Sequence, residues 1–237
     1  MILCIETATE VCSVALCSNG IILSLQEERE GRSHASKLTP LIEDTFKHAG
    51  TEMKLLDAIA ISMGPGSYTG LRIGVSVAKG IAYALKKPLI AISTLKAMSE
   101  GFIAGYAAAY PENALFCPMI DARRMEVYNA VYNKKGDEVR GVSADVIDNS
   151  SFSDILERHP VVFFGDGAAK CRETIKSPKA FFHEGFSPSA SFLAPLSEEA
   201  FRDEKFEDMA YFEPYYLKDF IATVPKNQVL VKKKEGK

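Results

Sequence analysis

Glycines and side-chain hydroxyls are concentrated in one stretch, SMGPGSYTGLRIGVSVAKG, which spans residues 62–80 and contains five glycines. An apolar run precedes it and a helical pattern follows it. Free N–H groups at such a strand-to-helix loop, together with the helix dipole, can bind an anion. The alternative is that the glycines only permit a tight turn, with a threonine as helix N-cap. The candidate residues for this anion cradle are Gly64, Gly66, Ser67, Thr69 and Gly70.

Two well-known loop motifs do not fit this stretch. A nucleotide P-loop requires a lysine directly after its second conserved glycine, and none is present. A nucleophile elbow around Ser67 would require glycines where Pro65 and Thr69 stand. No histidine and acid can be assigned to activate Ser67, so the sequence disfavours a serine peptidase.

Two acidic residues, Glu6 and Asp121, each end an apolar run. Paired carboxylates at such positions can hold a hydrated magnesium ion through water. The alternative, which we favour, is that each carboxylate accepts hydrogen bonds from N–H groups of its own turn. With Thr7 and a second glycine loop at Gly165 and Gly167, these acids complete a candidate nucleotide cradle.

The periodicity of apolar residues predicts strands and helices in alternation. Residues 2–5, 11–17 and 21–26 read as three antiparallel strands, with a polar turn before the third. Helical spacing follows, from Leu38 to a stop at Gly50. Residues 58–62 and 89–92 read as further buried strands on either side of the glycine loop and its helix.

The second half of the chain repeats the order of the first. Glu6 is followed after 14 residues by Gly20, and Asp121 after 15 residues by Gly136. Each half then reaches a glycine loop. We therefore predict an α/β fold of two related βββαβα lobes, divided near 109–113 into residues 1–109 and 110–237.

The helix after the glycine loop is unusually rich in small residues. Glycine inside a helix costs about 1 kcal/mol relative to alanine, so close packing must offset the cost. That packing is either against the chain's own sheet or against a helix of another chain. The small residues are Gly70, Gly74, Ser76, Ala78 and Gly80.

Composition limits the function classes. The chain has 237 residues, 47% of them hydrophobic and 25% charged, with a formal net charge of −3, which argues against avid binding of nucleic acid by this chain alone. Its four histidines are too dispersed for a metal pair, so no metal site is expected.

The five cysteines include no CxxC and predict reduced thiols in the cytoplasm. The N-terminal residues do not have the pattern of a secretion signal. No apolar run reaches about 18 residues, so the sequence predicts no membrane-spanning helix. The basic run from Lys232 is read as a solvated terminus.

Several segments resemble the bacterial TsaB (YeaZ) family of tRNA threonylcarbamoyladenosine biosynthesis proteins. They are IETATEVCSVAL from Ile5, SHASKLTPLI from Ser33, GPGSYTGLRIGVSVAKGIA from Gly64, IDARRMEVY from Ile120 and EPYYLK from Glu213. The resemblance implies an actin-like fold of the sugar kinase, Hsp70 and actin (ASKHA) group. It implies a noncatalytic subunit, without catalytic or metal-binding residues, in the complex that attaches threonylcarbamoyl to the adenosine beside the tRNA anticodon.

The resemblance also implies partners. These are a metal-binding catalytic subunit of the TsaD type and an ATPase of the TsaE type. We expect contact with tRNA only through the complex, ATP and magnesium only in the assembled complex, and a homodimer when the partner is absent. Family members dimerise through two helices, whose candidate contact residues here are Leu38, Leu41, Phe46, Arg72, Ile73, Gly74, Val77 and Ile81.

Two rival functions remain open at this point. One is an ATP-dependent small-molecule kinase with the same fold, and the other, less favoured, is a peptidase. A kinase would bind ATP and magnesium alone, whereas a scaffold would require its partner subunits.

Overall fold

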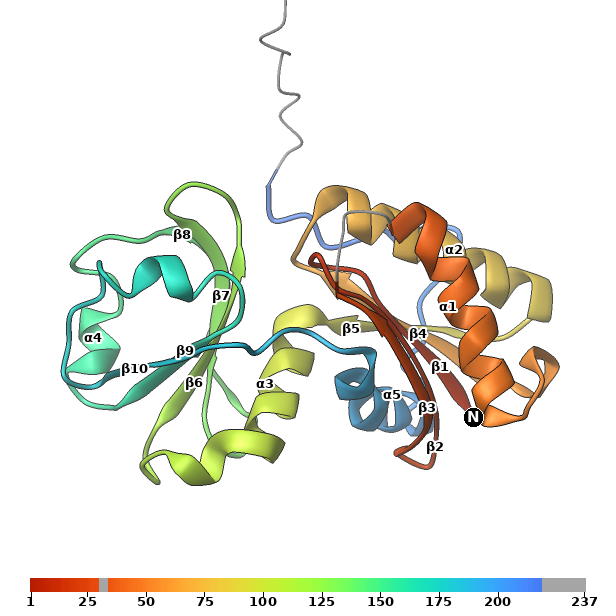
Figure 1. Ribbon diagram of the computed structural model, residues 1–237, viewed down its shortest axis with the longest axis horizontal. Coiled ribbons are helices and arrows are strands. Elements are labelled where there is room, and N and C mark those ends of the chain that lie inside the picture. The colour runs from red at the N-terminus through yellow and green to blue at the C-terminus, as the bar shows by residue number, and fades with distance from the viewer. Residues whose placement is uncertain (30–33, 219–237) are drawn as a thin grey trace, which may run out of the picture.

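The computed structural model describes residues 1–29 and 34–218, and it arranges them as two lobes, each built on a five-stranded mixed sheet (Figure 1). The basic run from Lys232 lies outside the described residues. Within the described part of the chain, no helix is both long and apolar enough to span a bilayer.

The first lobe begins with three antiparallel strands and continues with parallel ones. The sheet order is β3-β2-β1-β4-β5, and both long helices of this lobe, α1 and α2, cover the same face of the sheet, side by side (Figure 1). The elements are β1 (Ile2–Glu6), β2 (Cys12–Ser18), β3 (Ile21–Glu28), α1 (His34–Ala49), a 3-10 turn (Met53–Leu55), β4 (Ala58–Gly64), α2 (Tyr68–Leu85) and β5 (Leu89–Ser93).

The second lobe repeats this strand order, which confirms the predicted duplication. Its sheet runs β10-β9-β6-β7-β8, with the same antiparallel and parallel pairings. Its helices are much reduced, because single turns stand where α1 and α2 stand in the first lobe. The elements are β6 (Leu115–Asp121), β7 (Glu126–Tyr132), β8 (Glu138–Val146), α4 (Ser153–Leu156), β9 (Val161–Phe164), a 3-10 turn (Ala169–Cys171) and β10 (Ala180–His183).

Helix α3 (Thr94–Tyr106) joins the lobes, followed by a 3-10 turn (Ala107–Ala109). It packs on β4 and β5 on one side and on β6 and β7 on the other (Figure 1). Ser93 caps its N-terminus by accepting a hydrogen bond from the N–H of Lys96.

The predicted boundary near 109–113 separates the two sheets, but the second unit does not extend to residue 237 as expected. After β10 the chain returns to the first sheet through a 3-10 turn (Ala190–Phe192) and α5 (Leu193–Arg202), which packs on β1, β4 and β5. The Ala190 N–H donates to Ser13 Oγ at 2.9 Å. The apolar side chains of this segment bury the face of the first sheet that α1 and α2 leave uncovered.

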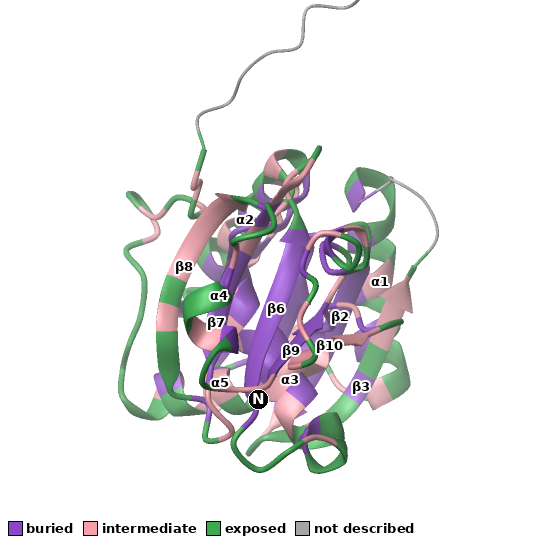
Figure 2. Ribbon diagram, turned by 90° about the vertical axis from the view of Figure 1, so that its left-hand side faces the viewer, coloured by how far each residue is buried: buried purple, intermediate pink, exposed green. Residues whose placement is uncertain are grey.

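The core is divided between the two faces of each sheet. Central strands such as β6 are buried, whereas the edge strand β8 is half-buried or exposed (Figure 2). All five cysteines are free and buried, as predicted.

Candidate functional site

The glycine loop after β4 rests on the end of β1. The N–H of Ser67 donates to the carbonyl of Ala8 at 2.6 Å. A Cβ added at Gly66 would overlap the same carbonyl oxygen and the Ala8 side chain. Gly66 is therefore required by close approach of the chain's own backbone.

The first turns of α2 pack on the same strand end. A Cβ at Gly70 would overlap the carbonyl oxygen of Thr7, and a Cβ at Gly74 would overlap its side-chain oxygen. Contact within the chain therefore offsets the helical cost of these two glycines, which settles for them the question that the sequence left open.

Capping of α2 differs from one sequence expectation. Ser67, not Thr69, is the N-cap, and its Oγ accepts a hydrogen bond from the N–H of Gly70 at 3.3 Å. Thr69 is exposed in the first turn. The Ser67 hydroxyl thus has a structural role.

The loop after β9 repeats the arrangement in the second lobe. Gly165 has φ +100°, close to the +112° of Gly64. The N–H of Gly167 donates to Met119 at 3.1 Å, and a Cβ at Gly167 would crowd the backbone of Ile120 and Asp121. Each glycine loop therefore seats against the acid-ended strand of its own lobe.

Glu6 is buried at the end of β1, with 1% of its surface exposed. Its Oε1 accepts a hydrogen bond from the Ala8 N–H at 2.6 Å, as the favoured interpretation predicted. Its Oε2 is also buried and has no hydrogen-bond partner among the described residues. Burial raises the pKa of Glu6 to about 7, although the Ala8 N–H and the nearby Ser62 hydroxyl act in the opposite direction.

Asp121, at the end of β6, is exposed. Its Oδ1 accepts a hydrogen bond from the Arg123 N–H at 2.8 Å and forms an ion pair with Lys170. The adjacent Asp166 is exposed by surface area and accepts a hydrogen bond from the Asp121 N–H at 3.1 Å, while desolvation by the surrounding backbone raises the pKa of its carboxyl. The two acid positions thus correspond in topology and differ in surroundings.

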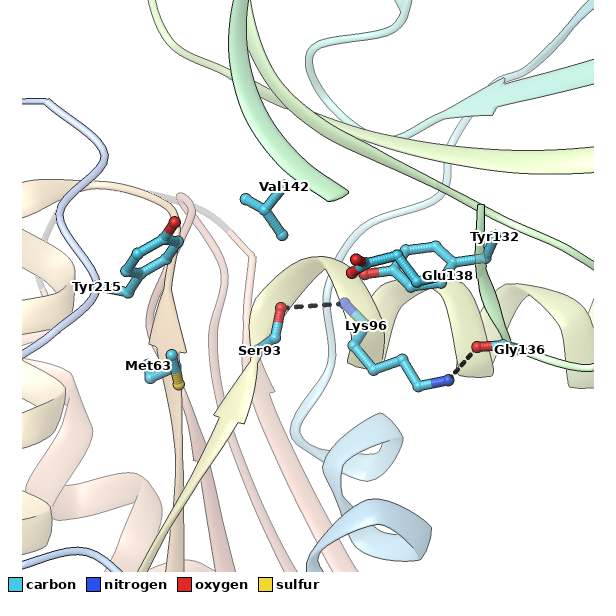
Figure 3. A pocket seen from close by; sticks show the side chains of 8 residues that line it. All are labelled: Met63, Ser93, Lys96, Tyr132, Gly136, Glu138, Val142 and Tyr215. Carbon is cyan, nitrogen blue, oxygen red and sulfur yellow. Dashed lines mark hydrogen bonds between the residues drawn. The ribbon is translucent and has the colours of Figure 1, made fainter. Parts of the chain in front are cut away.

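Two cavities are lined by residues of both lobes. The larger, of about 630 Å³, lies beside α3 (Figure 3). Lys96 crosses it, donating to the Gly136 carbonyl at 2.5 Å and forming an ion pair with Glu100. The cavity is lined by Met63, Ser93, Lys96, Tyr132, Gly136, Glu138, Val142 and Tyr215.

The other cavity, of about 510 Å³, joins the turn after β1 to the loop after β9. Thr9 and Glu10 line it from the first lobe, and Gly165 and Asp166 from the second. Neither cavity is lined by Glu6 or Asp121. The structure therefore places the candidate cradle residues in two separate groups, one in each lobe: Glu6, Thr7, Gly66 and Gly70, and Asp121, Gly165 and Gly167. The residues that line these cavities come from segments far apart in the chain, so most of them could be identified only from the tertiary structure.

Metal ligands are not gathered in the described part of the chain, where no group of three or more His, Cys, Asp or Glu side chains could hold an ion.

The expected partner surface on α1 and α2 requires a correction. Leu38 is 1% and Phe46 7% exposed, and Gly74 is buried against Thr7. The spacing of Leu38, Ile42 and Phe46 turns that stripe of α1 onto the sheet. These residues are occupied within the chain's own core.

The remaining residues of that surface are accessible. Arg72 is exposed, its guanidinium 5.2 Å from the centre of the Tyr68 ring. Four apolar residues lie at the margin of the core and are partly exposed: Leu41, Ile73, Val77 and Ile81. Gly80 is exposed beside them, and a Cβ added to it would meet nothing within 4 Å.

The amino-acid sequence matches proteins of known families over most of its length. The model of the TsaD family, tRNA N6-adenosine threonylcarbamoyltransferase, matches residues 25–235. The tRNA threonylcarbamoyladenosine biosynthesis protein TsaB of Escherichia coli is 31% identical over 231 residues, covering 93% of this chain and 96% of the relative. TsaB of Bacillus subtilis is 28% identical, covering 92% and 93% of the two chains.

A solved structure agrees with these relatives. YeaZ from Pseudomonas aeruginosa superposes with a TM-score of 0.77 at 29% identity, covering 91% of this chain and 99% of that one. The fold is accordingly α/β and actin-like, as the sequence predicted. With relatives matched over nearly their whole length, the chain belongs to the TsaB (YeaZ) family and takes part in the biosynthesis of tRNA threonylcarbamoyladenosine.

Proposed function

We propose that this chain is a noncatalytic subunit that docks a TsaD-type catalytic subunit through the outer face of α1 and α2, in the cytoplasm. The observation that carries the proposal is an exposed glycine inside a helix, Gly80, set in a partly exposed apolar flank of α2. Unlike one added to Gly70 or Gly74, a Cβ added to Gly80 would meet no described residue within 4 Å that could offset the cost of a glycine inside a helix. Close approach of a helix from another chain would offset it.

The surroundings of Gly80 support the same surface. Ile73, Val77 and Ile81 form an apolar flank of α2, and Leu41 of α1 lies at the margin of the same core cluster. The same face would pair two copies of the chain when the partner is absent. Among the described residues, the apolar side chains of this face remain partly exposed, as a docking surface requires.

The packing of the glycine loops supports a scaffold rather than a catalyst. In a phosphate-binding loop, the space beside the glycines is left free for the anion. Here Thr7 and Ala8 of the same chain occupy that space. The chain would raise activity by binding the catalytic subunit more tightly in its competent arrangement than in others. A TsaE-type ATPase, with its ATP and magnesium, and the tRNA would join through the assembled complex.

The docking face is tested with glycine substitutions. Gly80→Gln adds a side chain into open space, so the single chain should fold at least as stably while the bulk blocks docking. Gly105→Gln is the matched control, because Gly105 is also a helical, exposed glycine with nothing within 4 Å, on α3.

The readout is light scattering of the chain mixed with a TsaD-type subunit, followed by tRNA modification with the ATPase and threonylcarbamoyl-adenylate added. We expect Gly80→Gln to abolish the heterodimer and the modification, and Gly105→Gln to leave both unchanged. Equal behaviour of the two variants would refute the docking face.

The rival kinase reading rests on the two interlobe cavities, whose volumes suit a small ligand. Calorimetric titration of the chain alone with ATP and magnesium distinguishes the two. Tight binding, with turnover of a small substrate, would favour the kinase over the scaffold.

A further inference from the structure

The turn between β6 and β7 holds two successive arginines in an unfavourable backbone conformation. Arg123 has φ +73° and Arg124 has φ +50°. Residues other than glycine and asparagine adopt this left-handed region at a cost in free energy, because their Cβ crowds the backbone there. The turn between β2 and β3 reaches similar angles with Asn19 and Gly20, the pair that such turns favour.

The chain thus has two arginines in a turn conformation that asparagine and glycine adopt at a lower cost. The turn is held in place by the Arg123 N–H donating to Asp121 Oδ1 at 2.8 Å, and by the Ala122 N–H donating to the Glu126 carbonyl at 3.1 Å. The conformation is therefore fixed by the hairpin, and arginine is not required for it.

The charges around the turn leave both guanidinium groups available. Both arginines are exposed, and neither has an ion-pair partner among residues 1–29 and 34–218. Of the acids beside them, Asp121 pairs with Lys170 and Glu126 with Lys218, while Asp166 accepts a hydrogen bond from the Asp121 N–H. By contrast, Arg140 and Arg172 pair with Asp154 and Glu184, respectively.

We infer that Arg123 and Arg124 contact phosphate groups of the RNA backbone when the complex binds its tRNA. Guanidinium groups bind phosphate oxygens in a bidentate manner, and two adjacent ones suit a chain of phosphates. Neither Arg123 nor Arg124 lines either of the two cavities, and their exposed position favours an extended chain of phosphates over a small enclosed anion. The inference rests on the proposed function for the presence of tRNA, and it assigns a distinct surface in the second lobe, away from α1 and α2.

The test removes the charges while relieving the strain. Arg123→Asn with Arg124→Gly gives the turn the residues that it favours, so loss of folding cannot explain a loss of binding. Arg123→Lys with Arg124→Lys keeps the charge. Lys54→Ala with Lys205→Ala is the matched control, because it removes two exposed charges elsewhere, at side chains 68% and 66% exposed.

The measurement is the affinity for tRNA across a salt series, made with the full chain alone and with its complex with the catalytic subunit. Loss of two phosphate contacts should weaken binding and lower the slope of log K against log salt by about 1 per arginine. The lysine variant should retain the slope, and the distant control should match the parent.

Three outcomes are decisive. A lower slope only in the Asn/Gly variant supports the contact. An unchanged slope overturns it, while co-elution with the catalytic subunit shows independently whether the proposed function stands. Weaker binding of the catalytic subunit with unchanged RNA binding would also overturn it, because the turn would then be a protein contact.

Discussion

The two lobes share a strand order, an acid at the end of the first strand and a glycine loop that seats against it, yet they differ in what surrounds these features. In the first lobe the acid, Glu6, is buried, and helices cover both faces of the sheet to which it belongs. In the second, Asp121 is exposed and paired with Lys170, beside a single 3-10 turn. The same topological position therefore carries a neutralised surface charge in one lobe and a desolvated carboxyl in the other.

The two strand ends therefore have similar backbone packing. The elements that pack around each end determine whether its carboxylate is buried or exposed. The lobe with long helices has a partly exposed apolar flank on α2. The lobe with short helical turns exposes its hairpin turn, whose two arginines have no ion-pair partner among the described residues. Each lobe thus offers a different kind of surface.

The largest expected effect separates glycines that pack within the chain from one that does not. Gly70→Ala would push a Cβ into the Thr7 carbonyl and should lower the free energy of unfolding by more than about 3 kcal/mol. Gly80→Ala, with open space around it, should raise it by about 1 kcal/mol. Urea denaturation of both variants measures this, and similar shifts would contradict the packing account.

The next effect tests the burial of Glu6. Its folded-state pKa of about 7 lies above the ordinary 4.5, so its stabilising contribution is complete below pH 4.5 and is lost as the pH rises through 7. The full loss corresponds to about 3 kcal/mol. Glu6→Gln should remove this pH dependence and be the more stable form at pH 8.

The measurement is the unfolding free energy of parent and variant at several pH values between 4 and 8. Curves that stay parallel across this window would show that the Glu6 carboxyl is not desolvated as described.

A smaller effect distinguishes the two hydroxyls of the glycine loop. Ser67→Ala removes the N-cap of α2 and should cost about 1 kcal/mol, whereas exposed Thr69→Ala should change stability by less than about 0.5 kcal/mol. Thermal unfolding followed by circular dichroism compares them. The reverse order would restore Thr69 as the cap.

The smallest effect belongs to the acid of the second lobe. Asp121→Asn breaks a partly exposed pair with Lys170 and should cost less than about 1 kcal/mol, declining further as salt is added. Urea denaturation at low and high salt checks this. A cost comparable to that of a buried group would remove the contrast between the lobes.

The sequence predicted the features that depend on neighbours in the chain. Alternating apolar residues located the strands, the distance from acid to glycine revealed the duplication, and Glu6 and Asp121 accept the turn N–H bonds that were expected. These are local because backbone hydrogen bonding and strand periodicity act over a few residues. The resemblance of the glycine motif then identified the family.

Tertiary structure alone decided what each face meets. Helix α5 returns to the first sheet, where the Sγ of Cys4 lies 3.6 Å from the Oγ of Ser197. On the other face of that sheet, Leu38 and Phe46 are buried in the core. Helical periodicity identifies an apolar stripe without revealing whether its own sheet or another chain covers it. Likewise, the glycines of the loop could be assigned to close packing only once the end of β1 lay against them, because contacts between residues as far apart in the chain as Ala8 and Gly66 leave no local pattern in the sequence.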